Sequence, residues 1–434
     1  MVYYKQSRLI CIFILLFLIT KGIDAAQNLP PGQCVQNYVS GTDYFPSKVS
    51  VTTATLFTIN YNNNYKLVTN TDTKENFALV QCGTPVPTNL PAGTKIFNIS
   101  LNNVAILDTS VVPFLEVLGL RSNIAALDPT SVTSPCLQLL SANSSVVTIS
   151  MTNTTLATEQ LTKVDSVFNS MVDLTNPKAI SISASSDPGP LNRAEWLKFY
   201  SAFFNLEDKA NTIYNQISDN YNCLKSLSKT NNPPTVAWVS YNAPSSFNNN
   251  TASWTINDAI YKKIYTENAG GSYFNTTPHL YSTSASFLSA IANVDILIDE
   301  TLTALNITEV YTNYNLNSND IYKFVKNQAI YREDGLISPT DGRDWFENAI
   351  LMADEVLEDM MNIVNPNLPT SSYKRIWLRN VAKGETVKTK RDSDCSNVSA
   401  PLTDDAVQCS SLKSSKSKAA NNSPNSSIFL LLFT

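Results

Sequence analysis

Alternating apolar and polar residues characterise the first part of the chain. Three such runs, 48–61, 65–71 and 76–82, predict hairpin strands, because successive side chains of a strand point to opposite faces. Apolar runs at 95–101 and 103–110 predict further strands, and the second continues directly into a helical pattern at 111–120. A strand, a polar turn and a helix in immediate succession indicate an α/β unit.

The same unit recurs along the rest of the chain. Strand-like runs cover 146–151, 166–170, 178–185, 234–242 and 295–301, and helical patterns cover 155–164, 255–271 and 284–294. Two sets of α/β units predict an α/β fold with two lobes, each built on its own sheet.

A long helical stretch separates the two sets, because residues 191–227 contain neither Pro nor Gly. In its second part Ala210, Ile217 and Leu224 recur at helical spacing. The polar sequence at Asn205 can cap a new helix, so we expect two helices end to end, the first of which connects the lobes. A helical connection is stiffer than a pair of loops and limits hinge motion.

These patterns divide the chain into five parts. We expect a signal peptide (1–26), an N-terminal α/β lobe with a β-hairpin extension (27–190), connecting helices (191–227), a C-terminal α/β lobe (228–382) and a polar tail (383–434). The first part has basic residues before an apolar run and small residues after it, which is typical of secretory signal peptides. The tail lacks periodicity and predicts disorder. Its apolar end is a weak GPI-type signal, shorter than most.

Composition narrows the compartment and the partners. The chain has 434 residues, of which 43% are hydrophobic, and a net charge of −5. That charge gives no electrostatic reason to expect nucleic acid as a partner. The signal peptide predicts secretion, with a membrane or cell-surface partner left open and a monomeric state expected. Nine Asn-x-Ser/Thr sequons agree with export and predict a glycoprotein: Asn98, Asn143, Asn153, Asn249, Asn275, Asn306, Asn397, Asn421 and Asn425.

Cysteines point in the same direction. Beyond the signal peptide the chain has Cys34, Cys82, Cys136, Cys223, Cys395 and Cys409. An even number in an exported chain predicts disulfides, although sequence alone cannot select among the fifteen full pairings. Cys395 with Cys409 is the most local candidate pair, and buried free thiols are the alternative.

Several kinds of chemistry lack their motifs. The single histidine, His279, cannot build a transition-metal site of the several-His type. No Gly-x-Ser-x-Gly elbow, P-loop or Gly-x-Gly-x-x-Gly is present. We therefore expect no catalytic residues, no metal site and no cofactor.

Five stretches, in this order, resemble a known family: "YFPSKVSV", "INYNNNYKLV", "NNVAILDTSVVPFLEVLGL", "LNRAEWLKFYSAFFNLEDKANTIY" and "DGRDWFENAILMADEVLEDMMNIVNPNL". Together they are similar to helical-backbone periplasmic substrate-binding proteins, the ABC-transporter binding proteins of the siderophore and cobalamin type. The resemblance implies two Rossmann-like lobes joined by an α-helix, with a ligand cleft between them. The cysteines, sequons and tail depart from the bacterial pattern and put a periplasmic location and an ABC importer in doubt.

Candidate ligand contacts come from two sources. Ligands of α/β lobes meet the loops at the carboxyl ends of strands, which indicates Asp108, Thr109, Ser110, Asn169, Ser170 and Tyr241. The resemblance implies that Arg193, Trp196, Trp254, Tyr281, Arg343, Asp344 and Trp345 also face the cleft.

The stretch that begins at Asp341 leaves two interpretations open. Asp344 and Glu347 predict a capping box at the start of a helix whose apolar stripe, beginning at Phe346, packs on the lobe. Arg343 can bind a ligand carboxylate or hydroxamate through two hydrogen bonds, and Trp345 can stack on a flat ligand. Alternatively, Arg343 pairs with a neighbouring Asp and Trp345 fills the edge of the lobe.

Three functions follow from this picture. The first is a secreted, non-catalytic protein that binds a small organic ligand or a metal chelate, siderophore- or corrinoid-like. The second is a secreted hydrolase that uses paired carboxylates. The third is a surface adhesion protein that kept the fold without the ligand.

Overall fold

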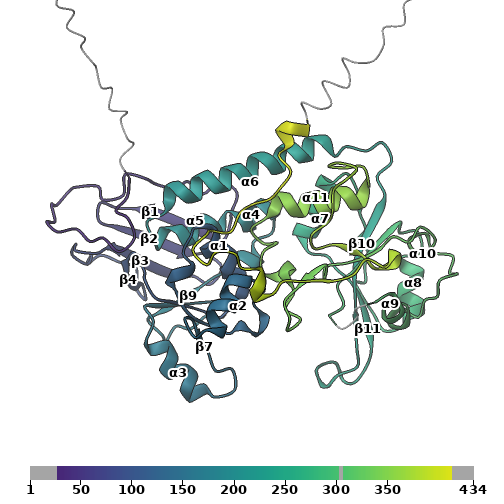
Figure 1. Cartoon of the computed structure of the whole chain (residues 1–434), viewed down its shortest axis with the longest axis horizontal. Coiled ribbons are helices and arrows are strands. Elements are labelled where there is room, and N and C mark those ends of the chain that lie inside the picture. The colour runs from purple at the N-terminus through teal and green to yellow at the C-terminus, as the bar shows by residue number, and fades with distance from the viewer. Residues whose placement is uncertain (1–26, 303–305, 413–434) are drawn as a thin grey trace, which may run out of the picture.

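The computed structural model describes residues 27–302 and 306–412 as two α/β lobes side by side (Figure 1). The predicted signal peptide and the end of the predicted tail, 413–434, lie outside the described residues. Within the described ranges, no helix is both apolar enough and long enough to span a membrane. The predicted fold class is confirmed, because each lobe is built on its own sheet with parallel strands at its centre.

The N-terminal lobe has a parallel sheet in the order β7-β6-β5-β8-β9. Its strands are β5 (Val104–Ile106), β6 (Ile124–Leu127), β7 (Val147–Thr148), β8 (Ser166–Asn169) and β9 (Ala179–Ser181), and its helices are α1 (Val112–Val117), α2 (Pro135–Ala142) and α3 (Thr154–Thr162). The central strand β5 and the edge strand β9 are buried throughout, as expected for a parallel sheet covered on both faces.

The predicted extension is a separate sheet in the order β1-β2-β3-β4. Its strands are β1 (Phe57–Tyr61), β2 (Tyr65–Asn70), β3 (Glu75–Gln81) and β4 (Lys95–Ile99). The first three form antiparallel hairpins, whereas β4 joins β3 in parallel.

The C-terminal lobe has a mixed sheet in the order β13-β11-β10-β14-β15-β17, with β12 also paired to β10. Its strands are β10 (Thr235–Asn242), β11 (Ser253–Ile256), β12 (Ser272–Tyr273), β13 (Leu280–Tyr281), β14 (Ile296–Asp299), β15 (Ile330–Arg332) and β17 (Arg379–Asn380). Its helices are α7 (Ile260–Asn268), α8 (Ser284–Ala290), α9 (Ile307–Tyr314), α10 (Lys323–Lys326) and α11 (Ala353–Val364). Strands β10, β14 and β15 are mutually parallel, so their carboxyl ends share one edge.

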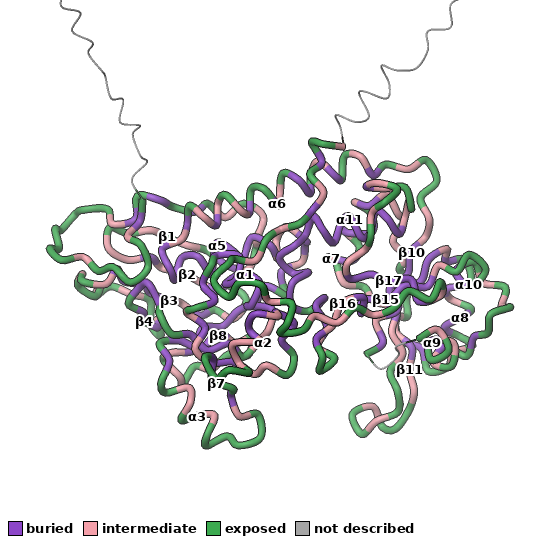
Figure 2. Tube along the Cα trace, viewed as in Figure 1, coloured by how far each residue is buried: buried purple, intermediate pink, exposed green. Residues whose placement is uncertain are grey.

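Three helices follow one another between the lobes: α4 (Pro190–Ala194), α5 (Trp196–Ala202) and α6 (Glu207–Leu227). The expectation that the first helical part connects the lobes is wrong. All of α5 is buried, because its aromatic side chains pack on Phe77 and Phe114 of the N-terminal lobe. Its charged residue, Lys198, is paired with Glu195. The amphipathic α6 instead runs along one side of both lobes and keeps an exposed outer face (Figures 1 and 2).

The predicted helix start at Asp344 also needs correction. Residues Asp344–Phe346 form a single 3₁₀ turn, and α11 begins only at Ala353. Glu347 makes no capping box with Asp344. Its carboxylate instead accepts hydrogen bonds from the backbone N–H groups of Thr133 (2.7 Å) and Ser134 (2.9 Å), at the start of α2 in the other lobe.

The described cysteines form three disulfides: Cys34–Cys82, Cys136–Cys395 and Cys223–Cys409. The pairing of Cys395 with Cys409 is wrong, because each of these cysteines meets a partner on the body of the protein. Nor are residues 383–412 disordered. After β18 (Lys388–Thr389), which pairs with β16 (Leu336–Ile337), the chain crosses to the N-terminal lobe and continues to α6 (Figure 1). We call residues 391–412 the strap.

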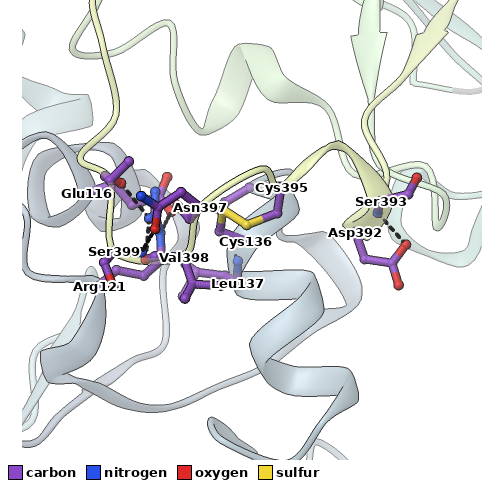
Figure 3. Close-up of a disulfide and its surroundings, with 12 residues drawn as sticks. Glu116, Arg121, Cys136, Leu137, Asp392, Ser393, Cys395, Asn397, Val398 and Ser399 are labelled. Carbon is purple, nitrogen blue, oxygen red and sulfur yellow. Dashed lines mark hydrogen bonds and ion pairs between the residues drawn. A yellow bond between two sulfur atoms is a disulfide. The ribbon is translucent and has the colours of Figure 1, made fainter.

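Disulfide Cys136–Cys395 fixes the strap to the first turn of α2 (Figure 3). Arg121 supports the same stretch, because its Nη1 donates to the carbonyl oxygens of Val398 and Ala400, each at 2.7 Å. Composition alone suggested a free tail, since polar residues dominate it. Covalent bonds and backbone hydrogen bonds order it instead.

Candidate ligand-binding cleft

Residues of both lobes meet around a small cavity of about 80 Å³. Ser110, Ser185 and Arg193 line it from the N-terminal side, and Tyr261, Trp345 and Phe346 from the C-terminal side. Three predicted site residues, Ser110, Arg193 and Trp345, are therefore brought together here.

Arg193 is held in a fixed position at this cavity. Its guanidinium carbon lies 3.5 Å from the ring centroid of Tyr261, a cation–π contact between the two lobes. Its Nε donates to the carbonyl oxygen of Asp187 at 3.0 Å, and its Nη2 donates to that of Ser185 at 2.5 Å. Burial raises the pKa of Tyr261, so the ring stays neutral beside the cation.

A second cavity of about 860 Å³ opens beside the first, and Phe346 lines both. The end of β10 and the loops that follow β10 and β14 supply most of its wall. Its lining residues are Ser240, Tyr241, Asn242, Ala243, Ser245, Phe247, Asn248, Ser253, Asn257, Glu300, Thr301, Leu302, Glu333 and Phe346. The smaller cavity is lined by both lobes, whereas the lining residues of the larger one all belong to the C-terminal lobe, at the carboxyl ends of β10 and β14. Such strand ends are where α/β folds bind ligands.

Apolar side chains on this wall are unusually exposed. Phe247 is 99% exposed, Leu302 69% and Phe346 51%. Exposed apolar side chains gathered around one cavity mark an interaction site more often than isolated ones do. The larger cavity therefore offers a ligand an aromatic and apolar surface.

Two carboxyl groups, of Glu300 and Glu333, line the same cavity. Glu300 forms an ion pair with the buried amine of Lys262. Burial raises the pKa of Glu333 to about 7, although the charges of Lys262 and Arg343 oppose this shift. Glu333 Oε2 is buried and has no hydrogen-bond partner among the described residues.

Arg343 holds the loop after β14 in place. Its Nη2 donates to the carbonyl oxygens of Thr301 (2.9 Å) and Leu302 (2.7 Å), and its Nη1 lies 3.5 Å from Glu333 Oε1. The guanidinium is buried and its donors are directed at the protein. The structure thus agrees with the second interpretation, in which Arg343 has a packing role, except that its carboxylate partner is Glu333.

Of the remaining predicted residues, only Tyr241 lines one of these two cavities, the larger one. Asp108, Thr109, Asn169 and Ser170 lie at the carboxyl ends of β5 and β8, where Asp108 caps a 3₁₀ turn by accepting from Ser110 N at 3.0 Å. They share a sheet edge but line neither cavity.

Four predicted residues have side chains that bind or pack within the protein interior and line neither cavity. Trp196 is fully buried and its Nε1 donates to Asp187 Oδ2 at 3.0 Å. The Trp254 indole donates to the carbonyl oxygen of Asn313 at 2.9 Å, and Tyr281 packs on Phe287.

The fourth is Asp344, which is 1% exposed. It accepts hydrogen bonds from Thr133 Oγ1 at 2.5 Å and from the Trp377 indole at 2.8 Å. Buried polar groups need such partners, and the Asp344 carboxylate finds them within the protein.

Sequence reasoning missed Glu300, Leu302, Glu333, Phe247 and Phe346. The strand-end rule gives Glu300, because it follows β14 directly. Phe346 was assigned to an apolar helical stripe, but it lies in the 3₁₀ turn before that helix, which begins at Ala353. Phe247 lies in a polar loop without periodicity and gave no signal.

Comparisons with known proteins add to this description. No protein-family model matches the chain. Over 187 residues it is 28% identical to an uncharacterized lipoprotein of Methanocaldococcus jannaschii, and the match covers 41% of this chain and only 40% of that protein.

Among solved structures, the chain is similar to a periplasmic heme-binding protein from Pseudomonas aeruginosa, with 12% identity and a TM-score of 0.45 over 65% of this chain and 98% of that chain. It is also similar to the periplasmic heme-binding protein HutB of Vibrio cholerae, with 14% identity and a TM-score of 0.45 over 61% and 99% of the two chains. A periplasmic binding protein from Veillonella parvula matches with 12% identity and a TM-score of 0.46 over 64% and 89%. All three neighbours are periplasmic binding proteins.

Proposed function

We propose that this chain is a secreted, non-catalytic solute-binding protein that takes a small organic ligand or a metal chelate, siderophore- or corrinoid-like, into the cleft between its lobes. The observation that supports this is a small cavity lined by both lobes that shares Phe346 with a larger cavity on the C-terminal lobe. The larger one, at about 860 Å³, falls within the range of ligand pockets in proteins. Its exposed aromatic wall supports binding of a partly apolar molecule.

Secretion is part of the same proposal. Disulfides persist in oxidising compartments, and the three disulfides, two of which close long loops, support an extracytoplasmic location. Intact-mass measurement of protein from its own host tests the removal of residues 1–26 and the occupancy of the sequons.

Thermal unfolding tests binding. The purified protein is heated with ferric hydroxamates, heme, cobalamin and pools of amino acids and peptides. A ligand at one hundred times its Kd stabilises the folded state by about 2.7 kcal/mol, which raises Tm by several degrees. The variant F346A, which removes the side chain shared by both cavities, should lose the shift. The variant V398A, in the strap, should keep it. A folded sample that shifts with none of these compounds contradicts the proposal.

A carboxylate-dependent hydrolase is the second candidate, because Glu300 and Glu333 line one cavity. The ion pair of Glu300 with Lys262 argues against it, since that carboxylate is already engaged. Turnover of a chromogenic glycoside panel that disappears in E333Q would replace the binding proposal with this one.

A further inference from the structure

We propose, on the basis of the function proposed above, that the larger cavity selects ligands with an organic cation, such as an ammonium group on an aromatic or apolar body. Three observations on its lining carry this inference: its aromatic faces, its carboxyl groups and the side chains that it lacks.

The aromatic faces come first. Tyr241, Phe247 and Phe346 line the cavity and approach it from three separate segments: β10, the loop after β10 and the turn before α11. Rings gathered around a site attract cations through their negative faces, each contact contributing about 0.5–2 kcal/mol. Phe247 is fully exposed, so no packing role explains its side chain.

The charged lining residues are both acids, Glu300 and Glu333. No Lys or Arg is among the described residues that line the cavity, and the neighbouring residues 303–305 have no charged side chain in the sequence. Each carboxylate has a protein cation behind it, Lys262 for Glu300 and Arg343 for Glu333. An anionic ferric chelate in the cavity would still face carboxylates and no lining cation, whereas an ammonium group would meet its natural acceptor.

Two cations lie behind this wall, but both are engaged. Lys262 pairs with Glu300, and its amine also lies 5.3 Å from the ring centroid of Trp238. Arg343 donates to two backbone carbonyls of the loop after β14. Neither is left to neutralise an anionic ligand.

Glu333 supplies an acceptor that lacks a donor. Its Oε2 has no partner within the described part of the chain, and its side chain is 2% exposed. An unpaired buried carboxylate oxygen costs free energy. A donor from the ligand, reached by rotation of the Glu333 side chain towards the cavity, removes that cost.

Isothermal titration calorimetry with compounds of one shape tests the charge preference. The cations are tryptamine and benzyltrimethylammonium, and the comparison compounds are tryptophol, which is neutral, and indole-3-propionate, which is an anion. At pH 8 we expect the cations to bind at least about tenfold more tightly, since one good cation–π or ionic contact contributes about 1.4 kcal/mol.

Variants connect that preference to the cavity. E333Q and F247A should each weaken cation binding about tenfold, whereas E159Q on the exposed face of α3 should leave it unchanged. Because Phe247 is fully exposed, F247A does not disturb folding. Cation binding should also weaken from pH 8 to pH 6 as Glu333 takes up a proton. The charged groups around Glu333 are Lys262, Arg343, Arg332 and Asp299.

Equal binding of the anion or the neutral compound, unchanged affinity in both F247A and E333Q, or no binding of either cation each overturns the cation preference. If heme, cobalamin or a ferric hydroxamate still binds, the proposed solute-binding function stands and only the cation preference is lost. If these also fail to bind, the proposed function fails as well.

Discussion

Removal of the disulfide that links the lobes through the strap is the most informative single perturbation of stability. In the variant C136S/C395S the strap loses its covalent bond to α2, while Cys223–Cys409 and Cys34–Cys82 remain. The hydrogen bonds from Arg121 to Val398 and Ala400 also remain. The variant therefore isolates the effect of closing one loop.

The size of that loop sets the magnitude. Although 259 positions separate Cys136 from Cys395, the Cys223–Cys409 bond already shortens the path between them. The remaining path leads from Cys136 to Cys223, across that bond, and back to Cys395. It is a loop of roughly 100 residues, whose closure stabilises the folded state by about 4.7 kcal/mol on the chain-entropy model. Since most measured values are lower, we expect a loss of about 3–5 kcal/mol.

Urea unfolding, followed by the fluorescence of the buried residues Trp196, Trp238 and Trp377, measures the loss. Hydrogen exchange should show faster exchange in residues 396–403. The matched control C34S/C82S opens a loop of 48 residues in the other part of the protein and should leave the strap protected. A loss below about 1 kcal/mol, or strap exchange unchanged from that of the control, would refute the reasoning that this bond constrains the unfolded chain and orders the strap.

Three further predictions concern ionisation and backbone packing. Burial opposes ionisation of Glu195, but hydrogen bonds from Lys198 and backbone N–H groups lower its pKa to about 2 from 4.5. The ionised Glu195 therefore stabilises the fold above pH 4.5, and this stabilisation is lost as the pH falls towards 2. E195Q should cost about 3 kcal/mol at pH 7 in urea unfolding and flatten the acid side of the profile. Burial raises the pKa of both Glu355 and Glu358 to about 9 from 4.5, so docking of the strap is strongest below pH 4.5 and weakens towards pH 9. Exchange at residues 405 and 407, corrected for intrinsic rates, should follow that profile in the wild type and lose it in E355Q/E358Q. A Cβ on Gly342 would lie 2.5 Å from the carbonyl oxygen of Ser131 in the other lobe, so G342A should lower the free energy of unfolding by about 1–3 kcal/mol, and an unchanged Tm would contradict this close approach.

The periodic parts of the sequence were the most predictable. The buried parallel strands and the two-lobe organisation follow from short apolar runs joined to helical patterns, and the structure confirms them. The strand-end rule also led to Ser110 and Tyr241. Once a strand is located in the sequence, the residues at its carboxyl end are known as well. These features depend on the local pattern of apolar and polar residues, which can be read from a single sequence.

Other features depend on distant partners. Trp254 lies in a polar sequence and was expected at the cleft, but its indole meets the carbonyl of Asn313 across the C-terminal lobe. Asp344 suggested a helix cap, but Thr133 and Trp377 bind it. The disulfides follow the same logic, since their partners lie on separate elements. Tertiary contacts outweigh local preference in each case.

The connections between the lobes bear on how the cleft works. Helix α6 spans both lobes, Glu347 accepts from the backbone of Thr133 and Ser134, and Cys136–Cys395 fixes the strap across the junction. With three such connections, opening and closing by large rotation would break buried hydrogen bonds. The cleft is therefore largely preformed, and a preformed site loses less conformational entropy on binding. Adjustment to a ligand falls instead to side chains that no packing restrains, above all Phe247. The fixed backbone then sets the position of the carboxyl groups, and the Phe247 side chain adapts to the ligand's shape.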